Sequence, residues 1–186
     1  MRWIPYVILL YLVVQLQTTL SRLVSFTFGP GEIGPDLAVV VAVFVAMQVR
    51  GGVEVYLACW SAGLAVDLAS GGGPGIGTVV GPMSLTFTIA GWMVYRLRET
   101  VFRQSMITQA MLGFVFALVA HGLWVTLQAI VAPRSIGWSD YWSVMLQMLL
   151  VALYTAVVTP LGHKLLERIS RWFVSPPMGR ERRSRY

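Results

Sequence analysis

Six long apolar blocks constrain the fold of this chain more than any other feature of its sequence. The blocks cover Ile4–Leu20, Leu37–Val49, Val53–Ala69, Val79–Tyr95, Met106–Ala132 and Tyr141–Leu161. A helix needs about 20 residues to cross a bilayer, a length that the first, fifth and sixth blocks satisfy and the third and fourth nearly reach. With 56% hydrophobic and 12% charged residues, the composition excludes an ordinary soluble domain. The sequence therefore predicts an all-α integral membrane protein with six transmembrane helices.

The second block is short for a membrane-spanning helix. Residues 37–49 cover only about 20 Å when they are helical. The block must therefore recruit Asp36 and Gln48 at its ends, thin the bilayer locally, or form a re-entrant segment. The sequence leaves these three alternatives open.

Basic residues gather on one side of the predicted membrane domain. Six spans place the N-terminus, the turn after the second block, the loop after the fourth and the C-terminal tail together. That side holds all 14 Lys and Arg residues except Arg22 and Arg134. The positive-inside rule then puts both termini in the cytoplasm, as in an inner-membrane protein. The net charge of +6 thus reflects orientation and not nucleic-acid binding, and we expect a transmembrane domain over 1–172 and a disordered basic tail over 173–186.

Six of these basic residues form a candidate surface at the cytoplasmic side. They are Arg96, Arg98 and Arg103 after the fourth block, and Lys164, Arg168 and Arg171 at the end of the sixth. The last three recur at i, i+4 and i+7, as in a helix that continues along the membrane surface. Two interpretations stay open, namely an anchor for anionic lipids and a docking face for a cytoplasmic partner.

Asp67 is the most informative polar residue inside the apolar blocks, because an ionisable group in a bilayer is costly. It shares a helix face with Gly63, so its carboxylate should point into the protein. The C-terminal end of a helix is partly negative, and Asp67 therefore needs a partner or a proton. We expect that partner to be His121, at the same predicted depth, or Arg22, or else the loop amides of residues 69–73.

The segment after Asp67 is rich in glycine, from Ser70 to Gly77. It lacks the Lys of a phosphate-binding loop, and its glycines instead suit a sharp turn between helices. The third block is rich in small residues, so we expect its helix at the centre of the bundle. No paired-carboxylate, zinc-protease or nucleophile-elbow motif occurs, and the single Cys59 fits no metal pattern. We expect no catalytic, cofactor or metal site.

Several short motifs, in this order along the chain, resemble the bacterial rod shape-determining protein MreD family. They are Pro35-Asp36-Leu37, Gly63-Leu64 followed by Asp67-Leu68 and Ser70, Gly77 after the loop, and the arginines after the fourth helix. The resemblance implies the six-helix fold of the substrate-binding subunits of energy-coupling-factor transporters. It also implies a non-catalytic scaffold of the cell-elongation complex, which maintains cell shape. Such a scaffold binds an MreC-like protein and, through it, MreB filaments and the RodA-type polymerase with its penicillin-binding transpeptidase.

Two functions can use the same outward-facing region. In the scaffold, a groove built from Asp67, Gly63, Ser70, Gly77, His121 and Arg22 would receive a segment of the partner. In the alternative, a substrate-binding subunit of a vitamin-type transporter, the region would close over a small molecule. The transporter subunits carry an Ala-x-x-x-Ala contact face on their first helix, which residues 4–14 lack. The sequence therefore favours the scaffold.

Overall fold

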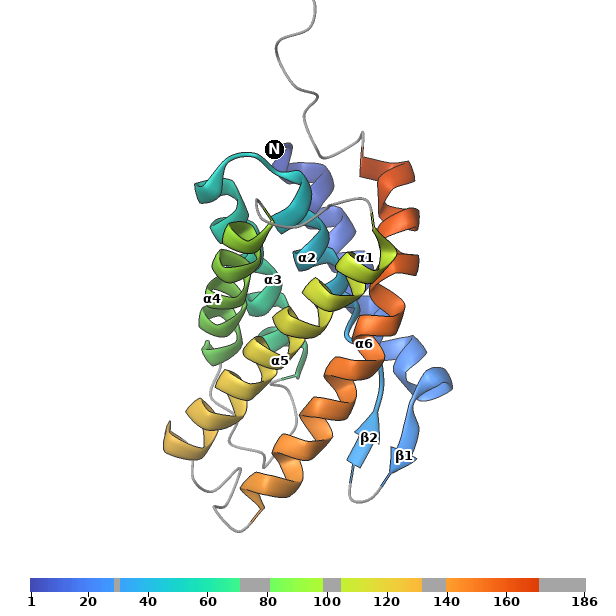
Figure 1. Ribbon diagram of the computed structural model, residues 1–186, viewed down its shortest axis with the longest axis vertical. Coiled ribbons are helices and arrows are strands. Elements are labelled where there is room, and N and C mark those ends of the chain that lie inside the picture. Colours follow the sequence, from blue (N-terminus) through green and yellow to red (C-terminus); the bar gives the residue numbers. More distant parts are fainter. Residues whose placement is uncertain (29–30, 71–80, 99–104, 132–139, 171–186) are drawn as a thin grey trace, which may run out of the picture.

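The structure of the protein, a computed structural model, describes residues 1–28, 31–70, 81–98, 105–131 and 140–170. Within these ranges the chain forms six α-helices and one short β-hairpin (Figure 1). The elements are α1 (Trp3–Val24), β1 (Phe26–Phe28), β2 (Gly31–Ile33), α2 (Leu37–Gln48), α3 (Gly52–Ser70), α4 (Pro82–Leu97), α5 (Met106–Val131) and α6 (Tyr141–Ile169). The predicted six-helix architecture is confirmed, and the hairpin is an element that the sequence did not predict.

Three helices in the described part of the chain are long and apolar enough to cross a membrane. They comprise Gly52–Ala69, Met106–Val131 and Tyr141–Ile169, whereas Trp3–Thr19 and Leu37–Gln48 are apolar but shorter. Large hydrophobic side chains also cover the outside of the bundle, as Ile4, Ile107 and Trp142 illustrate. An outer surface of this kind suits a lipid environment better than water.

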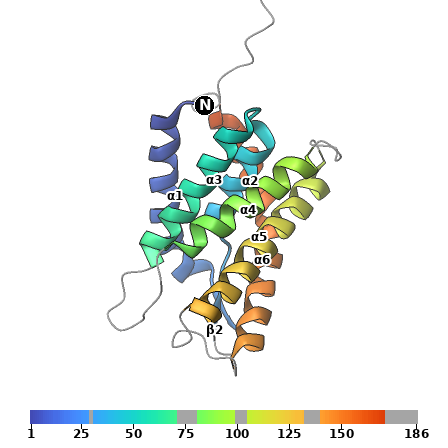
Figure 2. The ribbon, with the colours of Figure 1, turned by 90° about the vertical axis from the view of Figure 1, so that its left-hand side faces the viewer.

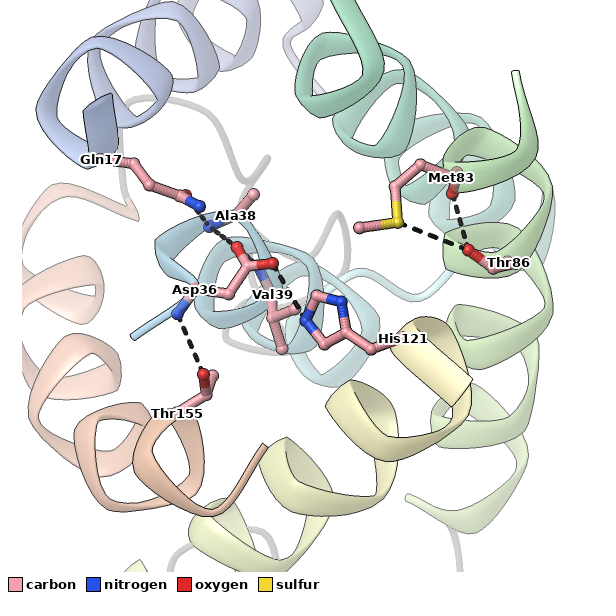
Figure 3. Close-up of polar contacts among 8 residues, drawn as sticks. All are labelled: Gln17, Asp36, Ala38, Val39, Met83, Thr86, His121 and Thr155. Carbon is pink, nitrogen blue, oxygen red and sulfur yellow. Dashed lines mark hydrogen bonds and ion pairs between the residues drawn. The ribbon is translucent and has the colours of Figure 1, made fainter. Parts of the chain in front are cut away.

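Helix α2 lies at the centre of the bundle and contacts all five other helices. Figure 3 views it nearly along its axis, with the other helices around it. Every residue from Ala38 to Met47 is buried. Because its neighbours enclose it, α2 need not match the thickness of a bilayer, which accounts for its length of only 12 residues.

The prediction that the third helix occupies the centre is therefore wrong. Helix α3 exposes Val53, Leu57, Trp60 and Leu68 on its outer side. Its small residues serve close packing against α4 instead. A Cβ atom at Gly63 would overlap the backbone at Met83 and Ser84 of α4.

The two chain ends of the bundle lie together. Figures 1 and 2 show the N-terminal end of α1 and the C-terminal end of α6 on one side, with the α2–α3 turn. We call this side the terminal end. The hairpin lies towards the opposite side, which we call the hairpin end. Both chain ends lie at the same side because the chain runs through the bundle an even number of times, once for each of its six helices.

Candidate functional site

Asp36 organises the start of the central helix. Its Oδ1 atom accepts hydrogen bonds from the backbone amides of Ala38, at 2.9 Å, and Val39, at 3.2 Å. These amides have no partner within the helix, so the carboxylate is an N-cap. The backbone amide of Asp36 in turn donates to Thr155 Oγ1 of α6 at 2.9 Å.

His121 of α5 approaches the same carboxylate from the other side. Its Nε2 atom lies 3.3 Å from Asp36 Oδ2, and each of the two side chains is only 7% exposed. The Ala38 amide also donates to Gln17 Oε1 of α1, at 3.3 Å. Gln17, Asp36, His121 and Thr155 thus meet at the start of α2 (Figure 3), and we call these four residues the cap cluster.

The cap cluster concentrates polar groups at the start of a helix whose own residues from Ala38 to Met47 are apolar and buried. The positive end of the α2 dipole and the two amides favour a carboxylate at this point. The contact with Asp36 is a buried ion pair when His121 is protonated. Removing Asp36 leaves His121 buried without this acidic partner, whereas removing His121 leaves Asp36 with its bonds to the α2 amides. The cluster therefore fixes α1, α5 and α6 relative to α2.

Asp67 performs a similar task at the start of α4, although it belongs to α3. Its Oδ2 atom accepts hydrogen bonds from the backbone amides of Gly81, Met83 and Ser84, at 2.9, 3.0 and 3.3 Å. Gly81, the N-cap residue of α4, has no capping side chain and a φ of 124°, which suits glycine. Asp67 therefore supplies the cap from the neighbouring helix.

The predicted contact between Asp67 and His121 is wrong, because each has another partner. Asp67 binds the α4 amides, and His121 lies against Asp36. The alternative partners, the amides of residues 69–73, differ from the amides observed, which belong to residues 81–84. The Arg22 side chain lies outside the described part of the structure, as do the Ser70 side chain and all of Gly77.

Arg98 closes the opposite end of α2. Its Nη1 atom donates to the carbonyl oxygens of Ala46, at 2.8 Å, and Val49. Its Nη2 atom lies 3.5 Å from the Arg50 carbonyl oxygen, and its guanidinium carbon lies 3.9 Å from the centre of the Tyr95 ring. Arg98 is only 6% exposed. Its assignment to a cytoplasmic docking or lipid surface is therefore wrong, because the guanidinium is bound to the end of α2.

The other predicted basic residues divide into two groups. Arg96, Lys164 and Arg168 are exposed, and the sixth helix continues to Ile169, so Lys164 and Arg168 do lie on a helix. Arg103 and Arg171 lie outside the described residues. The exposed residues remain candidates for a surface at the terminal end.

Asp36 was not predicted as a site residue, although its sequence carries a signal. An Asp directly after Pro and before an apolar run is typical of a helix N-cap. The inward face of α6 was not predicted either. Thr155, Thr159 and His163 recur there every four residues and are fully or almost fully buried. The His163 ring packs against Phe44 of α2, with 4.9 Å between the centroids. His163 therefore belongs to the buried core of the bundle.

These contacts are structural in character. Both buried carboxylates accept hydrogen bonds from backbone amides at helix starts. Among the described residues, no group of three or more His, Cys, Asp or Glu side chains is arranged to hold a metal ion. The two carboxylates hold the starts of α2 and α4 in place.

Comparison of the chain with family models, with curated proteins and with solved structures finds no match in any of the three.

Proposed function

We propose that this chain is a non-catalytic membrane scaffold of the bacterial cell-elongation complex. In this proposal it binds an MreC-like protein in the inner membrane, with both termini in the cytoplasm. Through that partner it couples MreB filaments to peptidoglycan synthesis and to the maintenance of cell shape. The RodA-type polymerase and its transpeptidase are further members of the same complex.

One observation carries the proposal. The two carboxylates in the motifs that resemble the MreD family, Asp36 and Asp67, both hold helix starts in the described structure. Gly63, in the same motifs, permits the close contact between α3 and α4. The residues that carry the resemblance thus determine the shape of the bundle, as expected for a protein that presents a fixed surface to partners.

The transporter alternative makes a different demand on the same residues. A site for a vitamin needs several polar groups that converge on a cavity and are available to the ligand. Asp36 and Asp67 instead accept hydrogen bonds from the chain's own amides, at distances of 2.9–3.3 Å. Their use in capping favours the scaffold over a small-molecule carrier.

The exposed basic residues fit a second part of the proposal. Arg96, Lys164 and Arg168 would face the cytoplasm, where anionic lipid headgroups attract basic side chains near the surface. The same residues would be accessible to a cytoplasmic partner. We assign them to lipid contact first, because arginine-rich flanks of this kind are general among inner-membrane proteins.

Affinity purification tests the proposal. The tagged chain is purified in mild detergent from a rod-shaped bacterium, and mass spectrometry identifies both proteins and small molecules. We expect an MreC-like protein in the eluate and a reduced amount with the Asp67→Ala variant. A Glu167→Gln variant, altered at an exposed position of α6 outside the predicted basic surface, serves as the control. A stoichiometric vitamin, with no elongation-complex protein, would overturn the proposal.

A further inference from the structure

An apolar groove runs along one side of the bundle, between the hairpin and α6. It is lined by Phe26, Ile33, Leu150, Leu153, Tyr154 and Val157, and has a volume of about 410 Å³. Figure 1 shows the hairpin beside the first half of α6. No residue of the cap cluster lines this groove.

The groove follows from the geometry of both elements. In the antiparallel hairpin, Phe26 pairs directly with Ile33, so the two side chains project from the same face. On α6, the lining residues recur at i, i+3, i+4 and i+7 from Leu150, which is one face of the helix. The polar residues Thr155 and Thr159 lie on another face, buried against the core. The groove is therefore open to the outside and separate from the polar interior.

The lining identifies the chemistry of an occupant. None of the six residues carries a charge, and the rings of Phe26 and Tyr154 lie 6.2 Å apart. Phe26, Leu153 and Val157 are each more than half exposed, so the groove opens sideways onto the surface that faces lipid in a membrane protein. A charged or strongly polar ligand would lose its hydration here without compensation.

The length of the groove distinguishes between two apolar occupants, namely a transmembrane helix of a partner and an alkyl chain. Leu150 and Val157 are seven residues apart on α6, or about 10 Å along its axis. The hydrocarbon core of a bilayer is about 30 Å thick, so a transmembrane helix of a partner would contact the groove over only a third of its span. A flexible alkyl chain suits a short groove, and the volume lies in the range of small-ligand sites, about 300–1,000 Å³.

We propose that this groove binds one acyl chain of a membrane lipid. The lipid would fill the space between the hairpin and α6 and hold the hairpin against the helix. The inference depends on the membrane location of the chain but not on its role as a scaffold.

Native mass spectrometry of the full chain, purified from bacterial membranes in mild detergent, tests the proposal. The informative variant is Val157→Trp, which places a large side chain in the groove. The matched control is Leu161→Trp, one turn further along α6, because Leu161 is 66% exposed, as Val157 is 63% exposed, but does not line the groove. We expect one retained adduct of phospholipid mass in the wild type and in the control. The Val157→Trp variant should show about a tenfold loss, equivalent to ~1.4 kcal/mol of binding free energy. Equal retention in all three proteins, or none in the wild type, would overturn the proposal.

A second measurement needs no variant and is therefore independent of folding defects. The wild-type chain is reconstituted in nanodiscs with a phospholipid that carries a photoreactive group in its acyl chain. We expect the crosslinked peptides to include residues 150–157 and to be depleted by competing phospholipid. A free fatty acid that competes equally well would assign the site to the alkyl chain alone. Crosslinks spread evenly over the exposed faces of α1 and α6 would refute a specific site.

A third experiment tests for a protein occupant. A photoreactive amino acid is placed at position 153 of the chain, and crosslinking is carried out in living cells. A crosslink from this position to another protein's transmembrane segment would replace the lipid by a protein occupant and overturn the inference. The amount of co-purified MreC-like protein is measured on the same samples. Loss of lipid binding with the partner retained, or the reverse, shows which of the two proposals has failed.

Discussion

The starts of α2 and α4 are stabilised by the same chemistry in two different ways. Asp36 caps its own helix and contacts residues of α5 and α6 as well. Asp67 caps a helix to which it does not belong, across the contact between α3 and α4. The first arrangement joins several helices at one point, and the second joins two. We therefore expect the contribution of a carboxylate to the stability of this bundle to increase with the number of helices that meet at it.

The largest effect is expected from Asp36→Ala. The change removes the α2 cap, which costs about 1–2 kcal/mol, and leaves the buried His121 ring without its acidic partner, which costs about 1–3 kcal/mol more, so the free energy of unfolding should fall by about 2–5 kcal/mol. Unfolding in mixed micelles by a denaturing detergent measures the loss. The control is Asp140→Ala, since Asp140 precedes α6 as an exposed N-cap residue without a side-chain capping bond. If both variants lost the same amount, the joining of helices at Asp36 would contribute nothing.

Replacing Arg98 tests the other end of α2. Arg98→Gln removes charged hydrogen bonds to the carbonyl oxygens of Ala46 and Val49, and should cost about 1.5–3 kcal/mol in the same unfolding assay. Arg96→Gln, two residues earlier and exposed, should change stability by no more than about 0.5 kcal/mol. Equal effects of the two substitutions would show that the buried guanidinium does not stabilise the helix end.

Asp67→Ala should lower the free energy of unfolding by less than Asp36→Ala or Arg98→Gln does. It removes a helix cap and nothing else among the contacts described for Asp67, so we expect a loss of about 1–2 kcal/mol. Asp67→Asn keeps an acceptor oxygen and should lose less. Membrane insertion should be unchanged in both, whereas co-purification of the MreC-like partner should decrease with Asp67→Ala. If Asp67→Ala lowered the stability but the MreC-like partner were still recovered in full, the α4 cap would not be needed for partner binding.

The sequence predicted the helices well, because each apolar block had to become one helix. The second block begins at Leu37 and ends within one residue of α2, between Asp36 and the turn at Gly51 and Gly52. The central position of α2 was less accessible. Its uniform apolarity, with no polar face from Ala38 to Met47, is the sign of a helix buried on all sides, whereas small residues drew attention to α3.

The site was only partly predictable for a physical reason. A cap on its own helix lies next to that helix in the sequence, so Pro35-Asp36-Leu37 contained the signal for α2. Asp67 lies 14 residues before Gly81, and no local pattern says which distant amides a carboxylate will reach. The pairing of His121 likewise depends on the packing of α5 beside α2, which equal depth in the membrane does not determine.

The last and smallest expected effect is a coupling energy, and it separates the two carboxylates directly. Two double-mutant cycles share His121→Gln and differ in the acidic partner, Asp36→Asn or Asp67→Asn. Residues in contact usually couple, so the first cycle should give about 1 kcal/mol, and the second should be additive to within about 0.5 kcal/mol. Unfolding of the four proteins of each cycle provides the values. If the Asp36 cycle were additive as well, the 3.3 Å approach of His121 would carry no energy, and the role of Asp36 would shrink to its bonds with the α2 amides and Thr155. Coupling in the Asp67 cycle would instead require a connection between the starts of α2 and α4 through the direct contact of these two helices.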